Sequence, residues 1–316
     1  MKPTLSVIIP SHPSDQAHLD RLLGCLREQR GFKAEEVEII VETEGNSEEA
    51  KAQGALRAQG SVIAFLCTDN YLLDPYFLRG MTTLAQAHDV IGAYTQHYDW
   101  VKYDKPLSRY FALLGANDPL CWWLGKADRQ PHWIKRRDVD IVSFPNSIPS
   151  LGDNGFFIKR EIILKAHLTP SSYFPMDCME DLRRLGHYRY HVSGSRTLWH
   201  RTGESWLTYF KKRFRYTRDL YFNQIYKIRW VMVDSDGDWA MVVLFALSSL
   251  VVIPHLLTSI YGFTKKPDWA WFLHPIVCLL LTLTYGAAWL SSLISQPPLL
   301  SPPLGVQTAF SDASAQ

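Results

Sequence analysis

The segment GSVIAFLCTDNYLLDP, residues 60–75, carries the strongest structural and functional signal in the chain. Val62 to Leu66 form an apolar run rich in β-branched and aromatic side chains, which is typical of a strand covered on both faces. Thr68 and Asp69 follow this run, and Asp74-Pro75 marks a turn or a helix start. Ligands of open parallel sheets bind beyond the carboxyl ends of the strands. Asp69 is therefore the first candidate for function, although an Asp in this place can also simply cap the next turn.

The composition indicates a folded protein that does not bind nucleic acid. The chain has 316 residues, which favours two domains, and its hydrophobic content of 47% allows a large core. A net charge of +2 is too small to indicate a nucleic-acid partner. The five cysteines include no CxxC pair, which favours a reducing compartment and argues against a disulfide framework or a zinc site. Too few apolar residues precede Pro10 for a signal peptide.

Strand and helix patterns alternate through the first part of the chain. Apolar runs at Leu5–Ile9 and Val37–Val41 precede the run at Val62, and helical patterns over 15–31 and 47–59 lie between them. Connections this short require right-handed crossovers, which predicts an α/β domain with a doubly wound, mostly parallel sheet. The absence of GxGxxG after the first strand and of GxxxxGK[ST] anywhere disfavours dinucleotide binding and P-loop chemistry.

Four motifs in order make residues 5–220 resemble the family 2 inverting glycosyltransferases, which have the GT-A nucleotide-diphospho-sugar transferase fold. That family has a strand ending in Pro, a strand ending in Asp-Asp-Gly, an Ala-Arg-Asn-x-Gly helix and a strand ending in an Asp-rich metal motif. The corresponding segments here are LSVIIPSH, VEIIVETEGNSEE, AKAQGALRAQG and SVIAFLCTDN. The resemblance implies a hexosyltransferase or related glycosyltransferase domain over residues 1–225 that uses Mg²⁺ or Mn²⁺.

The resemblance also places the nucleotide and the metal. It implies that Asp69 is a metal ligand and that Glu44 receives a uracil, which leans toward a UDP-sugar donor. The acidic motifs are thinner than the family's, with Cys67-Thr68 ahead of Asp69, so the diphosphate and waters would supply the remaining metal ligands. Glu42 and Glu44 can alternatively be solvated charges at a strand end. The donor-side candidates in this part are Pro10, Ser11, His12, Glu42, Glu44, Lys51, Thr68 and Asp69.

Two later segments resemble the donor-sugar and acceptor motifs of the family. In LGDNGFFIKRE, residues 151–161, the resemblance implies that Gly152, Asp153 and Asn154 contact the donor; an Asx turn is the alternative. In MEDLRRLGH, residues 179–187, it implies that Asp181 is the general base for an acceptor hydroxyl and that Glu180 binds the acceptor or orients the loop. Both acids can alternatively do no more than complement a helix dipole.

Two residues near the end of the domain complete the predicted site. His200 is the candidate to complete the metal shell, although a lone His is often structural. Arg213 lies among alternating cations and aromatics over residues 209–218 and is the candidate for diphosphate contact. Other cations of that segment suit an anionic membrane surface. Aromatic residues over 81–149 suit a sugar or isoprenoid-linked acceptor, and equally an ordinary interior.

The last part of the chain is predicted to lie in a membrane. The runs 239–263 and 269–294 contain no charged residue and each is long enough for ~30 Å of hydrocarbon, which predicts two transmembrane helices within a region spanning 226–296. Pro254 and His255 interrupt the first run and can make it kinked or re-entrant. Basic residues before it favour the inner, cytoplasmic membrane with the catalytic domain facing the cytoplasm. The tail 297–316 is predicted to be disordered.

The expected function is that of a membrane-anchored, metal-dependent inverting glycosyltransferase of cell-envelope glycan synthesis, acting on a lipid-linked or polysaccharide acceptor. A hydroxyl acceptor needs the base Asp181, whereas a polyprenyl phosphate is already ionised and needs none. Two alternatives stay open. One is a non-catalytic sugar-nucleotide-binding scaffold of an envelope-assembly complex, and the other is a nucleotidyl or phosphoryl transferase.

Overall fold

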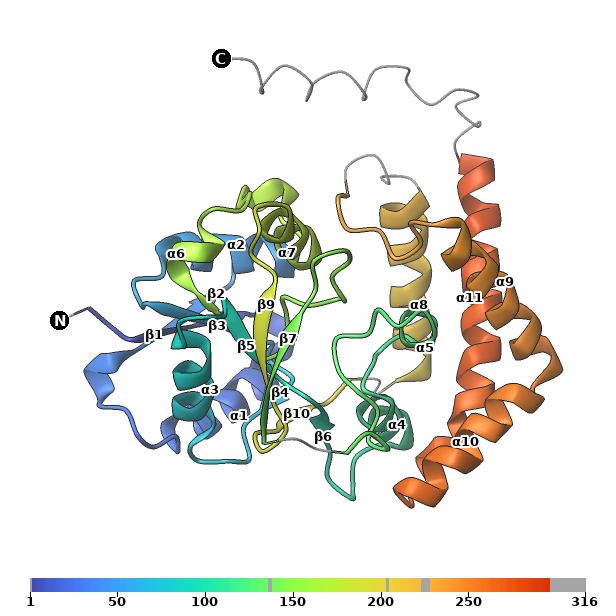
Figure 1. The fold of residues 1–316 in the computed structure, drawn as a ribbon, viewed down its shortest axis with the longest axis horizontal. Helices are drawn as coiled ribbons and strands as arrows, with labels where there is room; N and C mark the ends of the chain where they lie inside the picture. The colour runs from blue at the N-terminus through green and yellow to red at the C-terminus, as the bar shows by residue number, and fades with distance from the viewer. Residues whose placement is uncertain (1, 136–137, 203–204, 223–227, 296–316) are drawn as a thin grey trace, which may run out of the picture.

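The computed structural model describes residues 2–135, 138–202, 205–222 and 228–295, so the tail predicted to be disordered lies outside the described residues. Figure 1 shows an α/β unit on the side of the N-terminus and a group of C-terminal helices on the other side. Helices α4, α5 and α8 lie between these two parts.

The predicted alternation of strands and helices in the first part is confirmed. Helix α2 begins where the sequence allows it, because the Asn46 side chain accepts hydrogen bonds from the N–H groups of Glu48 and Glu49. The Glu49 side chain accepts one from the Asn46 N–H, which completes a capping box. The elements up to the middle of the chain are β1 (Leu5–Pro10), α1 (Gln16–Arg27), β2 (Val37–Glu42), α2 (Ser47–Arg57), β3 (Val62–Phe65), β4 (Asn70–Tyr71), α3 (Phe77–Gln86), β5 (Gly92–Thr95), β6 (Tyr98–Asp99), α4 (Pro106–Leu114) and α5 (Pro119–Trp123).

The later elements finish the sheet and then form the C-terminal helices. They are β7 (Val139–Ser143), β8 (Phe156–Lys159), α6 (Arg160–Ile163), α7 (Pro175–Arg184), β9 (Arg189–Ser193), β10 (Leu198–His200), α8 (Trp206–Tyr216), a π-helix (Thr217–Phe222), α9 (Asp236–Val251), α10 (Ile253–Lys265) and α11 (His274–Ser295). A 3₁₀-helix over Trp269–Leu273 leads into α11.

The main sheet has seven strands in the order β2-β1-β3-β8-β5-β9-β7. The pairs β1–β2, β1–β3 and β5–β9 are parallel, whereas β3–β8, β5–β8 and β7–β9 are antiparallel. The sheet is therefore mixed, and the prediction of a mostly parallel sheet is wrong. The reason is that β8 enters between β3 and β5 in the opposite direction, which the alternating pattern of the first part does not reveal.

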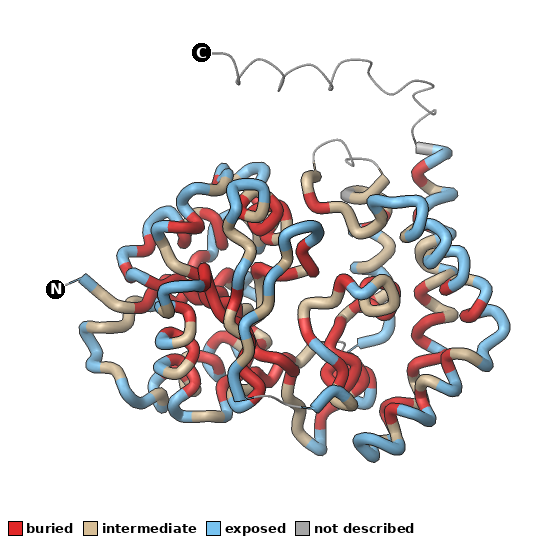
Figure 2. Tube along the Cα trace, in the orientation of Figure 1, coloured by how far each residue is buried: buried red, intermediate tan, exposed pale blue. Residues whose placement is uncertain are grey.

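Apolar clusters cover both faces of the main sheet. Successive side chains of a strand point to opposite faces, so one strand contributes to both clusters. On β3, Ile63 and Phe65 belong to one buried cluster that includes residues of α2, α6 and α7. Val62 and Ala64 belong to another that includes residues of α1 and α3. In Figure 2 the strands β1 and β3 are buried along their whole length, whereas the edge strand β7 is exposed or intermediate. The prediction that Val62–Leu66 is buried on both faces is confirmed, since each of these residues is fully buried.

A second, small sheet lies at the carboxyl ends of the main strands and has the order β4-β10-β6. In it Trp199 pairs with Tyr71 and His200 pairs with Asn70 in antiparallel register. Trp199 is almost fully buried, and its ring packs against that of Tyr71. This sheet therefore fixes a late segment of the chain next to the residues that follow β3.

The C-terminal helices agree only in part with the prediction of two membrane spans. Residues Trp269–Ile294 are long and apolar enough to cross a membrane as one helical segment. The first apolar run instead forms α9 and α10, which meet at an angle of 86° and have the shape of a broken span or a re-entrant loop. Pro254 lacks an N–H and cannot continue α9, and Val252 takes the left-handed φ of 71° at the break.

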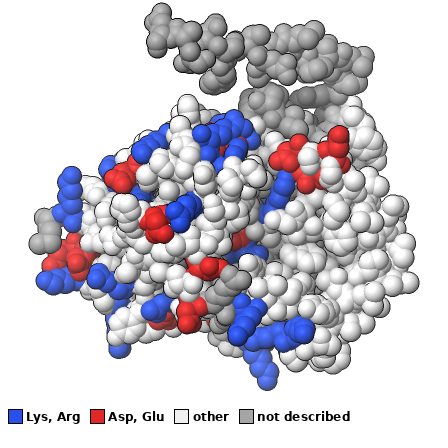
Figure 3. All heavy atoms as spheres, in the orientation of Figure 1, with Lys and Arg blue, Asp and Glu red and all other residues white. Residues whose placement is uncertain are grey.

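Figure 3 shows that the side of the molecule formed by α9 to α11 is almost without charge, whereas the α/β unit carries both signs. Large apolar side chains are exposed along all three helices, among them Leu250 (62%), Leu257 (61%) and Leu290 (54%). Monomeric soluble proteins rarely expose a continuous apolar surface of this kind. The surface is what a helix group needs for contact with lipid.

Two glycines give a matched test of the sheet packing. A Cβ at Gly92, the first residue of β5, would overlap the backbone carbonyl oxygen of Phe157, whereas a Cβ at Gly24 in α1 meets nothing within 4 Å. Gly92→Ala should lower the stability by about 1–3 kcal/mol or more, because backbone cannot yield as a side chain does. Gly24→Ala should raise it by about 0.5–1 kcal/mol through helix propensity. Thermal melts of both variants in detergent check the opposite signs.

Candidate active site

A cleft of about 620 Å³ lies beyond the carboxyl ends of β1 and β3. Its floor includes Pro10, the last residue of β1, and Ser11 after it, together with Thr68 and Asp69 after β3. Its other wall comes from α8, the π-helix and Tyr285 of α11. The cleft is thus at the place where open α/β sheets bind ligands, with one wall from a helix of the apolar C-terminal group.

Asp69 and His200 meet on the floor of this cleft. The Nε2 atom of His200 lies 3.4 Å from the Oδ2 atom of Asp69. The Asn70 side chain donates a hydrogen bond of 3.1 Å to Oδ1 of Asp69, and the Arg201 N–H donates one of 3.0 Å to its carbonyl. Burial opposes the charge of Asp69, but His200 and Lys212 outweigh it and lower the pKa of the carboxyl below its ordinary value. Asp69 is therefore an ionised carboxylate in a fixed orientation.

Lys51 is the centre of a second charged group. Its ammonium, with 1% of the side chain exposed, lies 2.8 Å from Oδ2 of Asp153 and 3.1 Å from Oε2 of Glu48. The Asn154 N–H and the Cys67 thiol both donate to Oδ1 of Asp153. Burial opposes ionisation of Asp153, but Lys51 and these donors hold its pKa below the usual value. Lys51 thereby ties helix α2 to the loop before β8.

The third group connects α8, α5 and α11. The Arg213 guanidinium donates 2.8 Å to the carbonyl of Asn117 and lies 3.4 Å from Oδ2 of Asp118. The Tyr285 hydroxyl donates to the same carboxylate oxygen, and the other oxygen caps α5 by accepting from Leu120 N–H. Asp118 therefore joins the cleft wall to the long apolar helix.

The structure brings most of the residues selected from the sequence to this one cleft. The residues that line it are Pro10, Ser11, His12, Lys51, Thr68, Asp69, Asp153, Asn154, His200 and Arg213. Five others do not belong to the described lining, namely Glu42, Glu44, Gly152, Glu180 and Asp181.

Each of these five has a different environment. Glu42 is buried and paired with Arg57, and Glu44 is exposed. Gly152, at a φ of +112°, faces the carbonyl of Pro175. Their predicted contacts with a donor therefore find no support in the geometry of the cleft.

The acids of α7 differ most from expectation. The helix begins at Pro175, so Glu180 and Asp181 lie in its second turn and not at its start. Glu180 accepts hydrogen bonds from Arg183 and Arg184, which lower its pKa against the effect of burial. Asp181 lies 2.7 Å from Nε of Arg229. Asp69 and Asp181 thus do not share the cleft that the structure describes.

Asp177 is the acid of the first turn of α7, and it is not among the site residues predicted from the sequence. Its carboxylate accepts hydrogen bonds from the N–H groups of Arg229 and Trp230 at 2.8 and 2.7 Å. Burial raises its pKa above the ordinary value. Because Trp230 lines the cleft, Asp177 and Asp181 together hold one of its walls in place through Arg229 and Trp230.

Three further residues line the cleft although the sequence analysis did not predict them as site residues, namely Lys212, Asp118 and Tyr285. Lys212 stands next to Arg213 in the segment of alternating cations and aromatics, and Asp118-Pro119 is a visible helix-start signal. Nothing in the sequence marks Tyr285, which lies within an apolar run. Only the packing of α11 against α8 brings it to the cleft.

Asp69 and His200 have the chemistry of a small divalent-cation site. The Asp69 carboxylate suits Mn²⁺ or Mg²⁺, and the imidazole beside it favours Mn²⁺, because Mg²⁺ prefers oxygen ligands. The buried Nδ1 atom of His200 has no hydrogen-bond partner among the described residues. No third His, Cys, Asp or Glu among the described residues joins the pair in a compact ligand group. Such an ion would take its other ligands from substrate phosphates and water, as Mg²⁺ sites commonly do.

Comparison with solved structures shows the fold. No protein-family model and no curated protein matches the chain. The mannosyltransferase PcManGT from Pyrobaculum calidifontis, solved in complex with GDP-Man and Mn²⁺, is similar over 94% of this chain and 88% of that chain, with 12% identity and a TM-score of 0.51. TarS residues 1–349 from S. aureus, solved with UDP-GlcNAc, is similar over 94% and 93%, with 12% identity and a TM-score of 0.44. The first likeness shows that the chain has a glycosyltransferase fold.

Lys51→Met tests whether the charged group at α2 supports the cleft. Removal of the ammonium leaves Asp153 and Glu48 without their cation, which should cost about 3 kcal/mol of stability. Adding Asp153→Asn to this variant should restore a large part of the loss. Denaturant unfolding of the wild type, the single variant and the double variant measures this coupling.

The same pair predicts a pH dependence. Lys51 lowers the pKa of Asp153 in the folded state, so its stabilisation is present above the ordinary carboxyl range and is lost as the pH falls through the lowered pKa. The stability difference between the wild type and Lys51→Met should therefore shrink between pH 7 and acid pH. A difference independent of pH would contradict the assigned pairing.

Proposed function

We propose that this chain is an inverting glycosyltransferase that moves a sugar from a nucleotide-diphosphate donor to a lipid-linked acceptor at a membrane. The observation that carries the proposal is the meeting of Asp69 and His200 on the floor of a cleft at the strand ends of a glycosyltransferase fold. Inversion and a role in cell-envelope glycan synthesis come from the sequence resemblance to family 2.

The donor is assigned to the part of the cleft between β1, β3 and α2. PcManGT carries GDP-Man and Mn²⁺ in its solved complex, which supports a nucleotide sugar and a divalent cation for this fold. Bound Mn²⁺ or Mg²⁺ would act as a Lewis acid on the diphosphate. Asp69 and His200 would hold the ion, and Lys51 would fix Asp153 and Asn154 against the donor sugar. The lean toward uridine rested on Glu44, which is exposed and outside the lining, so no base is preferred.

Lys212 and Arg213 supply positive charge on the opposite wall. Both line the cleft from α8, and Asp118 and the Asn117 carbonyl hold Arg213. Fixed cations beside a departing diphosphate stabilise the charge that develops as the glycosidic bond breaks. A phosphate on the acceptor would meet the same two side chains.

The acceptor is proposed to be a lipid phosphate. Asp181, the base expected for a hydroxyl acceptor, lies outside the lining and is engaged by Arg229. An ionised phosphate oxygen needs no base, because it is already a nucleophile at neutral pH. In this proposal Asp181 has a positioning role, since Arg229 adjoins Trp230 of the cleft wall.

A groove between α8 and α11 offers a place for the lipid chain. It is lined by Leu207, Phe210, Lys211, Phe214, Leu280, Leu283, Thr284 and Ala287 and is almost entirely apolar. The same two helices give Lys212, Arg213 and Tyr285 to the cleft. Since Trp269–Ile294 is apolar enough to cross a membrane, a lipid in the groove would lie in hydrocarbon with its phosphate at the cleft.

The proposed location is the inner membrane with the α/β unit in the cytoplasm. Trp269–Ile294 would be the span, and the bent pair α9–α10 would add a broken span or a re-entrant loop. The orientation rests on the basic residues of the sequence before α9.

Identification of the released nucleotide tests the function directly. The purified chain is incubated with a mixed set of nucleotide sugars, Mn²⁺ and a polyprenyl phosphate. A glycosyltransferase releases a nucleoside diphosphate and forms a glycolipid. A nucleotidyl transferase would instead release a sugar phosphate, and a phosphoryl transferase that moves the sugar phosphate would release a nucleoside monophosphate. A scaffold binds a donor and releases nothing.

Asp69→Ala should abolish Mn²⁺-dependent donor binding and turnover, because the remaining His200 is a single ligand. Folding and membrane insertion should be unchanged, since Asp69 is partly exposed in the cleft. Asp89→Ala, at an exposed carboxylate with only a weak ion pair to Arg189, is the matched control and should bind as the wild type does. Calorimetric titration of the donor with and without Mn²⁺ provides the measurement. Normal turnover of Asp69→Ala would refute the metal assignment.

Ala287→Trp tests the groove. The large ring would fill the space between α8 and α11 and should raise KM for a polyprenyl phosphate tenfold or more, while slow donor hydrolysis stays unchanged. Leu290→Trp, at an exposed position of the same helix outside the groove, is the control. Equal effects of both substitutions on KM would show that the lipid does not bind there.

A further inference from the structure

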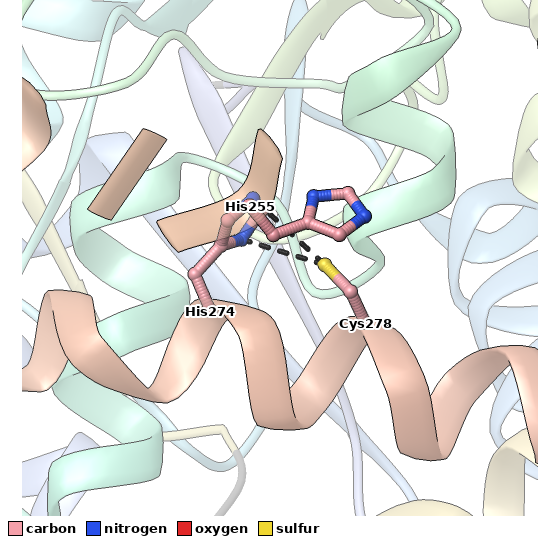
Figure 4. A group of neighbouring side chains, drawn as sticks. All are labelled: His255, His274 and Cys278. Atoms are coloured by element: carbon pink, nitrogen blue, oxygen red, sulfur yellow. Dashed lines mark hydrogen bonds between the residues drawn. The ribbon is translucent and has the colours of Figure 1, made fainter. Parts of the chain in front are cut away.

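A second group of metal-ligating side chains lies within the C-terminal helices, apart from the cleft. His255 comes from α10, and His274 and Cys278 come from adjacent turns of α11. All three are fully buried, and their ligand atoms lie within 4.8 Å of one another. Figure 4 shows the two imidazoles and the thiol converging between the helices.

Each imidazole has one nitrogen engaged and the other available. The Tyr110 hydroxyl is 2.7 Å from Nδ1 of His274, and the Ser249 hydroxyl is 3.1 Å from Nε2 of His255. Nδ1 of His255 is buried without a hydrogen-bond partner among the described residues. Within the described part of the chain, Nε2 of His274 contacts the Cys278 sulfur alone, at 3.8 Å, and that sulfur lies 3.6 Å from Nδ1 of the same ring. Metal-binding histidines show this pattern, in which a hydroxyl or carbonyl orients the nitrogen that does not bind the ion.

The surroundings of the group favour a soft or borderline cation. The rings of Trp122, Trp123 and Phe245 pack against the two imidazoles. A thiolate and two imidazoles suit Zn²⁺, whereas Mg²⁺ and Ca²⁺ require oxygen ligands. Zn–N distances of about 2.0 Å and a Zn–S distance of about 2.3 Å need ligand separations near 3.5 Å, so the side chains must close by about 1 Å.

We propose that His255, His274 and Cys278 bind one Zn²⁺ that fixes the bent pair α9–α10 to α11. Binding would release the thiol proton of Cys278, and water would take the fourth position. The bend at Val252 brings His255 to α11, and the hydrogen bond between Ser249 and His255 spans this bend. A bound ion would add a link from the bend to α11. The proposal is independent of the glycosyl transfer proposed above.

The test uses the full chain in detergent, with Asp69→Ala so that the cleft binds no ion. After chelator treatment and addition of one equivalent of Zn²⁺, followed by desalting, elemental analysis should find about one zinc per chain. Co²⁺ should give a thiolate-to-cobalt charge-transfer band. Zinc should raise the melting temperature by several degrees, and chelator should reverse the rise.

Cys278→Ser should lose the cobalt band and retain less than a tenth of the zinc, and His255→Gln should lose most of it. Cys25→Ser, at a half-buried cysteine of α1, is the matched control and should behave as the parent. If the full chain with Asp69→Ala, the parent of these variants, shows neither a cobalt band nor bound zinc, the proposal is overturned, whether or not the variants fold. Zinc retained by Cys278→Ser at the level of the parent would also overturn it.

Discussion

The antiparallel pairing of β10 with β4 is the contact on which the candidate site depends. It places His200 opposite Asn70, so that His200 reaches Asp69 and the Arg201 N–H binds the Asp69 carbonyl. The small sheet is made of short strands, and its stability comes from the packing of Trp199 against Tyr71 and of Tyr98 against His200. A carboxylate after β3 and an imidazole near the end of the domain become one site through backbone hydrogen bonds and aromatic packing.

Helix α8 has a different role on each of its faces. Lys212 and Arg213 face the polar cleft, whereas Leu207, Phe210 and Phe214 face an apolar groove against α11. The Tyr285 hydroxyl of α11 donates a hydrogen bond to the Asp118 carboxylate, so a helix with a largely apolar surface is linked to the wall of the polar cleft. In the proposed function, this division of one helix would place the phosphate of a lipid acceptor in the cleft and its chain in the groove.

Charged residues buried near the cleft act mainly by fixing other residues. Lys51 holds Asp153 and Glu48, Arg213 is held by Asp118, and Asp177 binds the backbone before Trp230. Except for Lys51 and Glu48, which both lie in α2, these pairs join elements far apart in the sequence, so their loss would move a wall of the cleft. The ion proposed at His255, His274 and Cys278 would join α10 to α11 in a similar way, without any carboxylate.

The sequence by itself determined the buried strand Val62–Phe65, the strand-end position of Asp69 and the apolar run that forms α11, because burial and helix length follow local hydrophobic patterns. It also selected His200 and Arg213, which the fold brings to the cleft. Pro254 also marked the break in the first apolar run, where the bend of 86° lies. Only the tertiary structure decided the antiparallel insertion of β8 and the placement of Glu180 and Asp181 outside the cleft. These depend on strand direction, helix register and packing between distant segments, which no local pattern encodes.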